Sequence, residues 1–111
     1  MVTPRPILRG EVWLAALDPT VGREIQKTRP CLIVSPDSMN RFLGTVTAVP
    51  LTSGSRPAGF RVPVVFKTTS GLLLCDQLRT LDKARLIKRL GAVAPTTLLN
   101  TLAVLRDLFE E

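Results

Sequence analysis

The chain has 111 residues, of which 45% are hydrophobic and 22% are charged, so it can bury one core and is too apolar to be disordered. Its net charge of +6 leaves two interpretations open, a polyanionic partner such as RNA or DNA, or simply a well-solvated surface. No apolar run approaches the roughly 18 residues of a membrane span, and no signal-like apolar segment follows the first charges, so we expect a cytoplasmic protein with one domain over residues 1–111 and no membrane partner.

Cysteine usage and the lack of histidine bear on metal binding. Cys31 and Cys75 both stand inside apolar runs, which is typical of buried core thiols. Zinc sites commonly need about four cysteine or histidine ligands, and the chain contains no histidine. The sequence therefore predicts no metal and no other cofactor.

Short strands dominate the first half of the chain. Residues 1–9, with their prolines and arginines, are predicted to form a loose leader. Runs rich in apolar and β-branched residues then predict three strands, at 10–17, 30–35 and 44–51. The continuous apolar run at 30–35 is typical of a central strand buried on both faces, and Pro36 begins a helical turn after it. Polar composition predicts loops at 18–28 and 52–60.

The second half continues this pattern and ends in a helix. Strands are predicted at 61–67, 71–75 and 88–93, with a short helical turn at 80–86. Pro95 fits the first position of a helix of about four turns. Its apolar stripe consists of Leu98, Leu102, Leu105 and Phe109, widened by Leu99 and Leu108. These elements predict a mainly β (α+β) protein, a small β-barrel with a C-terminal amphipathic helix packed on it.

Several sequence blocks follow one another in a recognisable order. They are Arg9-Gly-Glu-Val-Trp13, Asp18-Pro-Thr20, the stretch from Glu24 to Pro36 (EIQKTRPCLIVSP), Val49 to Ser53 (VPLTS) and Cys75 to Lys83 (CDQLRTLDK). Over nearly the whole chain they resemble the MazF/PemK toxin family, the toxins of type II toxin–antitoxin systems.

The resemblance implies a fold, an activity and partners. The family fold is an SH3-like barrel of the CcdB/PemK type that works as a homodimer. The family activity is sequence-specific, metal-independent cleavage of single-stranded RNA, leaving 2′,3′-cyclic phosphate and 5′-hydroxyl ends and inhibiting translation and growth. A cognate antitoxin blocks the RNA groove of such toxins, and DNA is bound only indirectly, through the antitoxin complex.

The RNA cleavage reaction makes three demands on side chains. A group must accept the proton of the attacking 2′-hydroxyl, another must protonate the leaving 5′-oxygen, and a donor must stabilise charge on the phosphorus. Arg29 matches the family's catalytic arginine, and its guanidinium can hold two phosphate oxygens. We expect charge stabilisation from it; the alternative is a surface arginine that anchors the loop before a strand.

Two further residues complete the predicted catalytic set. Thr52 stands at the family's threonine position and could hydrogen-bond a phosphate oxygen, with Ser53 as its substitute; the alternative is a turn residue bonded to its own backbone. Glu24, near Arg29, would be the base if partial burial favoured its protonated form. A solvated carboxylate that balances neighbouring cations is the alternative for Glu24.

The block that begins at Cys75 supplies accessory candidates. Some family members use the aspartate at the position of Asp76, or an arginine where this chain has Leu74, so the leucine argues against a mechanism that needs this arginine. Asp76 has a structural role as its alternative, and Arg79 is a candidate for holding Asp76 or a phosphate. The predicted RNA-binding residues are Lys27, Arg56, Phe60, Arg61 and Lys67, with Phe60 stacking on a base.

Two other functions fit the same fold. A protein-binding gyrase poison resembling CcdB would act through a C-terminal Trp-Gly-Ile end, whereas this chain ends in Asp107-Leu-Phe-Glu-Glu111. A non-catalytic nucleic-acid-binding barrel would have no use for Glu24, Arg29 and Thr52 together. Both alternatives are therefore less consistent with the sequence than an RNA endonuclease.

Overall fold

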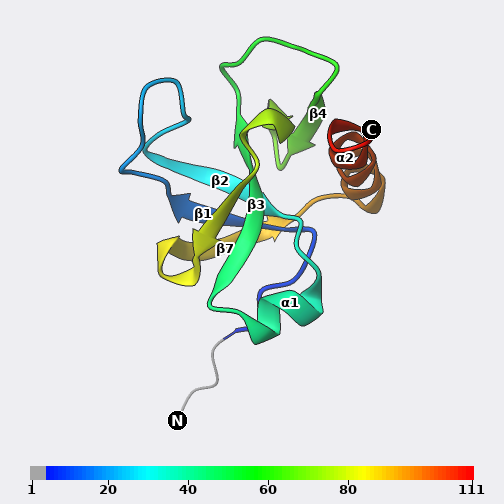
Figure 1. The fold of residues 1–111 in the computed structure, drawn as a ribbon. Coiled ribbons are helices and arrows are strands. Elements are labelled where there is room, and N and C mark those ends of the chain that lie inside the picture. Colours follow the sequence, from blue (N-terminus) through cyan, green and yellow to red (C-terminus); the bar gives the residue numbers. More distant parts are fainter. Residues whose placement is uncertain (1–4) are drawn as a thin grey trace.

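The computed structural model describes residues 5–111, and its framework is a sheet of seven antiparallel strands (Figure 1). The strands are β1 (Glu11–Ala16), β2 (Thr28–Ile33), β3 (Thr45–Thr52), β4 (Arg61–Phe66), β5 (Thr69–Leu74), β6 (Arg79–Asp82) and β7 (Leu86–Ala92). The helices are α1 (Asp37–Phe42), α2 (Pro95–Leu108) and two short 3-10 helices, η1 (Cys75–Gln77) and η2 (Lys83–Arg85). The strand order is β4-β5-β3-β2-β1-β7, and β6 pairs with β3.

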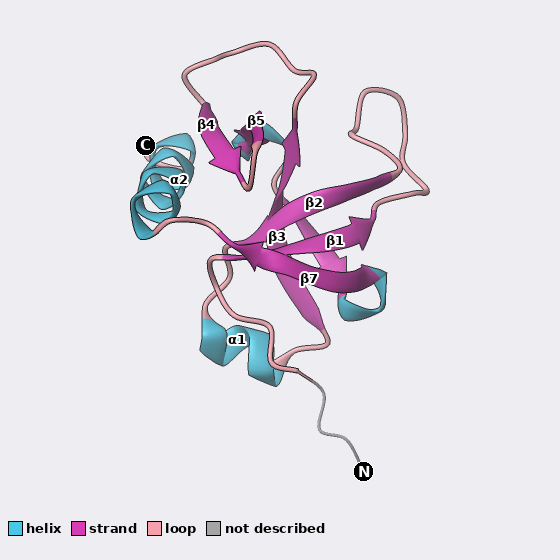
Figure 2. Cartoon of the chain, turned by 180° about the vertical axis from the view of Figure 1, so that it is seen from behind, coloured by secondary structure: helices cyan, strands magenta, loops and turns pink. Residues whose placement is uncertain are grey.

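Strand β3 belongs to both halves of a strongly bent sheet. Its first residues pair with β6, its middle residues pair with β2, and its last two, Leu51 and Thr52, pair with β5. The change of partner follows Pro50, which has no N–H to contribute to a ladder. The bend directs β4 and β5 away from the plane of β1, β2 and β7 (Figure 2).

Alternating side chains divide the interior into two apolar clusters. Along β2, Leu32 belongs to one cluster, while Cys31 and Ile33 belong to the other. The first cluster continues to Leu105 of α2, and the second is closed by Leu81 of β6. The predicted burial of the 30–35 strand on both faces is confirmed, because a strand with a core on each side needs apolar residues at successive positions.

The two outer strands of the sheet approach each other beside α2. A Cβ added to Gly91 of β7 would lie 3.1 Å from Cζ of Phe66 in β4, so a larger residue would require the Phe66 ring to shift. Helix α2 packs against β4 and η1 (Figures 1 and 2). The predicted mainly β fold, a small barrel-like sheet with a C-terminal helix, is confirmed.

One predicted element is wrong. We expected a helical turn at 80–86, but Arg79–Asp82 is strand β6 and only Lys83–Arg85 is helical. Leu81 pairs with Val46 of β3 and is fully buried. The secondary structure of this segment is thus set by pairing with a strand more than 30 residues away, and not by its local composition.

The C-terminal helix begins at Pro95 and spans 14 residues, as predicted, but its buried face is narrower than its apolar stripe. Leu105 and the unexpected Thr101 are buried, and the Thr101 hydroxyl donates to the Thr97 carbonyl at 2.8 Å. Leu99 and Phe109 remain 64% and 74% exposed. Within residues 5–111, no helix combines the length and the hydropathy that crossing a bilayer requires.

Candidate active site

A groove lies between the β1–β2 loop and the β3–β4 loop. These two loops lie at the top of Figure 1. The volume of the groove is about 390 Å³, and both loops and Gln77, the last residue of η1, contribute to its wall. We call it the loop groove. It is lined by Gly22, Arg23, Glu24, Ile25, Gln26, Arg29, Thr52, Gly54, Ser55, Leu74 and Gln77. The three predicted catalytic residues, which lie up to 28 positions apart in the sequence, therefore share one concave surface.

Arg29 is the second residue of β2, opposite Ala15 of β1. Its half-buried side chain is oriented by Nε, which donates to the Gln26 carbonyl at 3.2 Å. The terminal amino groups of the guanidinium make no hydrogen bond to the part of the chain that the structure describes. One edge of Arg29 thus anchors the loop, and the other donors remain available to an anion in the groove.

Thr52 is the last residue of β3 and is only 7% exposed. Its Oγ1 accepts a hydrogen bond from the Gly54 N–H at 3.3 Å, so the turn role foreseen for this residue is present. An accepting hydroxyl still has its own proton to donate. Ser53 is exposed, and the groove wall continues with Gly54 and Ser55 rather than with Ser53.

Glu24 lies at the rim of the loop groove. Its Oε1 accepts a hydrogen bond from the Val21 N–H at 2.6 Å, while its own N–H donates to the Val21 carbonyl at 3.2 Å. Its side chain is exposed, so the partial burial that we expected for a base at this position is not found. The carboxylate closes a turn of its own loop, which holds it at the edge of the groove rather than on its floor.

A second hollow, of about 460 Å³, adjoins the loop groove and shares Arg23, Glu24 and Gln77 with it. Asp76 and Arg79 line it, but they do not contact each other as proposed from the sequence. Arg79 Nη1 donates to the Leu17 carbonyl at 3.4 Å. Asp76 is held instead by Arg61, because the β4–β5 register places Arg61 opposite Leu74, two residues before Asp76.

The Arg61–Asp76 pair is bidentate. Arg61 Nε donates to Asp76 Oδ1 at 3.1 Å, and Nη2 donates to Oδ2 at 3.0 Å. These hydrogen bonds from Arg61 hold the pKa of Asp76 below its ordinary value. The guanidinium also lies 5.6 Å from the centre of the Phe60 ring.

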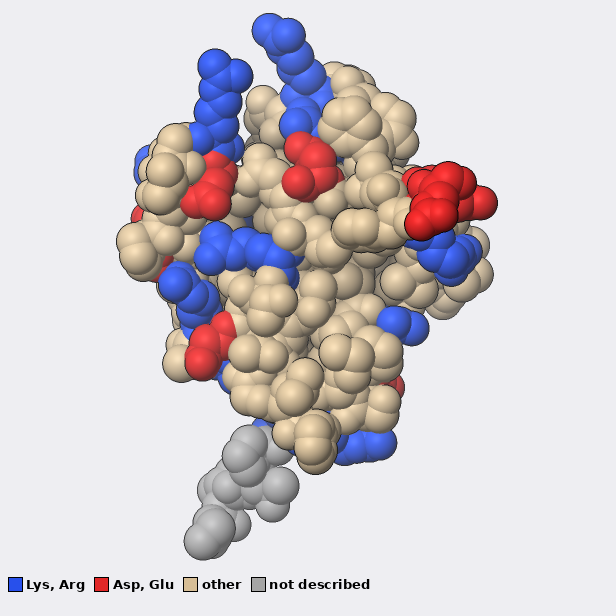
Figure 3. All heavy atoms as spheres, viewed as in Figure 1, with Lys and Arg blue, Asp and Glu red and all other residues tan. Residues whose placement is uncertain are grey.

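The predicted RNA-binding residues separate into two groups. Lys27, Arg56 and Phe60 are exposed on the two loops beside the groove, and basic side chains project from both loops at the top of Figure 3. Lys67 follows the far end of β4 and packs its Nζ 5.9 Å from the Phe66 ring centre, away from the groove. The Arg61 side chain is engaged in the ion pair with Asp76 that is described above.

Sequence reasoning did not assign a role to two residues of the groove wall. Arg23 lines both hollows. The only feature of the sequence that could have pointed to a role for it is its position beside Glu24. Gln77 Oε1 accepts a hydrogen bond from the Ile25 N–H at 2.6 Å. Leu74, where the family resemblance led us to consider an arginine, also lines the groove and is an apolar residue that is only 1% exposed.

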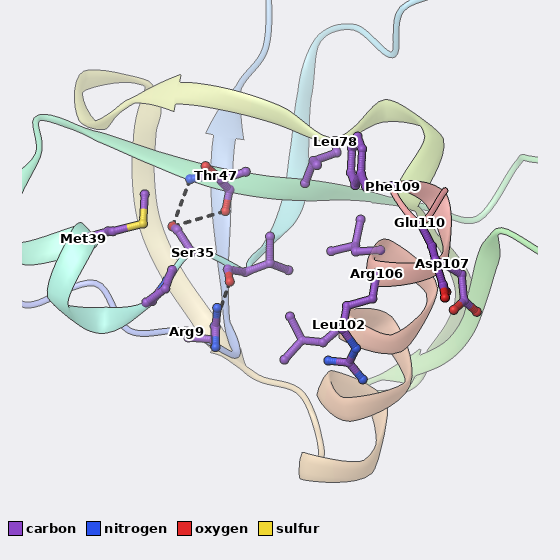
Figure 4. A pocket seen from close by; sticks show the side chains of 13 residues that line it. Arg9, Ser35, Met39, Thr47, Leu78, Leu102, Arg106, Asp107, Phe109 and Glu110 are labelled. Carbon is purple, nitrogen blue, oxygen red and sulfur yellow. Dashed lines mark hydrogen bonds between the residues drawn. The ribbon is translucent and has the colours of Figure 1, made fainter.

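The largest hollow lies elsewhere, between α1 and the end of α2, with a volume of about 850 Å³ (Figure 4). Its wall is mostly apolar and includes Val34, Leu102 and Phe109. Arg9 is fixed beneath it by a 2.7 Å hydrogen bond from Nε to the Val34 carbonyl. None of the predicted catalytic residues lines this hollow, which we call the α1–α2 groove.

Neither cysteine lines the loop groove. Both cysteines are free and buried, which confirms the predicted core thiols, and burial raises the pKa of the Cys31 thiol to about 12 and that of the Cys75 thiol to about 11. Among residues 5–111, no three histidine, cysteine, aspartate or glutamate side chains are grouped closely enough to hold a metal ion.

Comparison with known proteins identifies the family. Residues 8–109 match the family described as PemK-like, MazF-like toxin of type II toxin–antitoxin system. Endoribonuclease PemK of Escherichia coli is 51% identical over 98 residues, covering 83% of this chain and 73% of that protein.

Solved structures agree with the sequence relatives. The crystal structure of MazF from Deinococcus radiodurans superposes with a TM-score of 0.86 at 27% identity, covering 95% of this chain and 97% of that one. A mycobacterial endoribonuclease in complex with its cognate antitoxin gives 0.77 at 30% identity, covering 91% and 92% of the two chains. The chain therefore belongs to the family of PemK-like, MazF-like toxins of type II toxin–antitoxin systems.

Proposed function

We propose that this protein is a toxin that cleaves single-stranded RNA at short sequences, without a metal, to 2′,3′-cyclic phosphate and 5′-hydroxyl ends, and so inhibits translation and growth. The observation that carries the proposal is that Glu24, Arg29 and Thr52 line one groove between two basic loops. The relatives support it, because those most similar in sequence are named endoribonucleases.

The geometry suggests a role for each residue in the reaction. The ribose 2′-oxygen attacks the adjacent phosphorus, and the free amino groups of Arg29 hold two phosphate oxygens as negative charge accumulates. The Thr52 hydroxyl donates to a phosphate oxygen while it accepts from Gly54. Glu24 has one oxygen that is not used by Val21, and this oxygen takes the 2′-hydroxyl proton.

The leaving 5′-oxygen must gain a proton when its bond to phosphorus breaks. A guanidinium releases its proton reluctantly, so Arg29 is a poor donor for this step. The loop groove is open to water, which supplies the proton, and Glu24 returns its own to the solvent. This assignment uses no histidine and no arginine at the position of Leu74.

RNA and protein partners follow from the same surface. Lys27 and Arg56 follow the phosphates of a single strand across the groove, and the exposed Phe60 stacks on a base. We expect a cognate antitoxin to occupy the loop groove, silence the enzyme and bring the complex to DNA. A mycobacterial relative has been solved in complex with its cognate antitoxin, which supports the existence of such a partner. The cytoplasm, where messenger RNA is translated, is the proposed place of action.

The test is an RNA cleavage assay in excess EDTA with a long unstructured RNA and end mapping of the products. We expect discrete cuts with 5′-hydroxyl ends, and a decrease in rate of about 100-fold or more for Arg29→Ala. Arg41→Ala, which removes an exposed arginine on α1, is the matched control and should cut normally.

Two failures are distinguishable in this assay. Intact RNA across several sequences with the wild-type protein would overturn the ribonuclease function and favour a protein target. Wild-type cleavage by Arg29→Ala would leave the activity standing and show that the loop groove is not its site.

A further inference from the structure

We propose that η1 is the common anchor of the two loops that form the loop groove, and that its successive residues Asp76 and Gln77 are positioning residues, one for each loop. Neither side chain needs to touch the reacting atoms in this role. The link to catalysis rests on the function proposed above, whereas the anchoring itself is a property of the RNA-free protein.

Gln77 holds the β1–β2 loop. Its Oε1 accepts from the Ile25 N–H at 2.6 Å across 52 residues of sequence. Within the described part of the chain, this is the one hydrogen bond that ties residues 20–26 to an element distant in sequence. Ile25 follows Glu24 directly, so the contact fixes the backbone that presents the candidate base.

Asp76 holds the β3–β4 loop through Arg61. Both carboxylate oxygens accept from the guanidinium, whose third nitrogen, Nη1, donates to the Arg56 carbonyl at 3.0 Å. The Arg61 N–H also donates to the Ala58 carbonyl at 3.0 Å. The second half of the loop is thereby attached to η1.

The anchor itself is rigid. Cys75, the first residue of η1, is buried in the apolar cluster that contains Leu73 and Leu105, and α2 and β4 pack against η1. Asp76 and Gln77 therefore project from a fixed backbone toward two otherwise loosely attached loops. This arrangement sets the separation of the loops, and with it the width of the groove.

The same contacts argue against Asp76 as a proton carrier. Two hydrogen bonds from Arg61 engage both of its oxygens and favour its charged form. An ionised carboxylate has no proton to donate, and each Asp76 oxygen already accepts a hydrogen bond from Arg61. Asp76 acts through Arg61 on the loop, and the proton steps fall to other groups.

The first experiment measures amide hydrogen exchange in the full chain without RNA. Gln77→Met removes the acceptor with little change in volume, and we expect the Ile25 amide to exchange at least about fivefold faster. Gln77→Glu keeps an acceptor oxygen and should restore protection. Gln26→Met makes the same chemical change on an exposed neighbour and should leave Ile25 exchange unchanged.

The second arm tests Asp76 with Arg61. Asp76→Ala and Arg61→Ala should each accelerate exchange in residues 54–61 and leave the Ile25 amide protected. In RNA cleavage, the two single variants should lose similar factors of activity, and the double variant should lose no more than either. The dependence of the cleavage rate on pH should keep the same shape in Asp76→Ala, because a positioning residue does not gain or lose a proton in the reaction.

Either arm can overturn the proposal. Unchanged exchange in Gln77→Met and Asp76→Ala would show that η1 does not anchor the loops, whatever the proteins do to RNA. Loss of a limb of the pH profile in Asp76→Ala, with Arg61→Ala still active, would make Asp76 a proton carrier. If exchange responds as expected but no variant or wild-type protein cuts RNA, the anchor stands and the proposed function fails.

Discussion

Glu11 is a buried carboxylate that joins the segment before β1 to both β1 and β7. Its Oε1 accepts from the Leu8 N–H at 2.9 Å and from Trp13 Nε1 at 3.1 Å, and its Oε2 accepts from Arg89 Nε at 2.6 Å. Burial alone would raise the pKa of Glu11, but the hydrogen bonds from Leu8, Arg89 and Trp13 outweigh it and lower the pKa.

The sign of the pH effect on stability follows from this lowered pKa. A group whose pKa is lower in the folded state stabilises the fold above its unfolded pKa, and this stabilisation disappears as the pH falls through the folded value. We expect Glu11→Gln to lower the free energy of unfolding at neutral pH by about 1–3 kcal/mol. Urea unfolding across pH should show the deficit shrinking in acid; an equal deficit at every pH would contradict it.

The candidate catalytic residues could be named from sequence, but their surroundings could not. Arg29 and Thr52 lie in blocks with local signatures, so their membership in one groove followed from the expected fold. The partner of Asp76 could not be predicted, because it depends on the β4–β5 register that places Arg61 opposite Leu74. The sequence left a solvated Glu24 as an alternative but could not show the turn within its own loop that places this carboxylate at the rim.

At Gly71, strand β5 approaches strand β3 more closely than a residue with a side chain would allow. A Cβ on Gly71 would lie 2.9 Å from the backbone carbonyl oxygen of Thr52 and 3.2 Å from Cδ2 of Leu51. Thr52 is paired with Leu72, the next residue of β5. The missing side chain at Gly71 therefore helps to fix where the candidate catalytic hydroxyl lies.

Gly71→Ala should displace β5 from β3 and move Thr52. We expect a cost of about 1–3 kcal/mol in unfolding free energy, and a decrease of tenfold or more in the rate of RNA cleavage. Gly44→Ala, at a position with no atom within 4 Å of the added Cβ, serves as the control. Equal cleavage by the two variants would mean that this close approach does not position Thr52.

The elements differ in how far their sequences determine them. Helix α2 carries its own signals, a proline at its start and an apolar period, and was predicted with its correct first residue. Strand β6 has no such local signal. It forms because its residues pair with β3, with Leu81 opposite Val46. Sequence patterns could not reveal this pairing, and the same holds for the burial of Thr101 within the helix.

The surface of the molecule as a whole leaves a considerable apolar area uncovered near its C-terminal helix. Leu99, Leu108 and Phe109 are exposed on α2, and Phe109 also borders the α1–α2 groove (Figure 4). Acidic residues gather at the end of the helix, at the right of Figure 3. We propose that a second copy of the chain covers this apolar surface, which would form the homodimer expected for the family.

Phe109→Asp should disrupt such a dimer without unfolding the protomer, because the side chain is 74% exposed. Sedimentation at micromolar concentration should give twice the 12.1 kDa chain mass for the wild type and a single-chain mass for the variant. Val21→Asp introduces the same charge at another exposed apolar position, on the β1–β2 loop, and should remain dimeric. A wild-type protein that sediments only as a single chain would refute the proposed dimer.

The pairing of β1 with β7 has a consequence for the order in which the protein is made. Glu11 of β1 lies opposite Ala92 of β7. The first strand of the chain can therefore pair along this edge only after β7, the last strand, has been synthesised. Arg29 is positioned by pairing with Ala15, whose other partner is Leu86. Contacts this distant in sequence form late and slowly. A nascent chain on the ribosome therefore cannot complete the candidate catalytic surface until β7 has been synthesised.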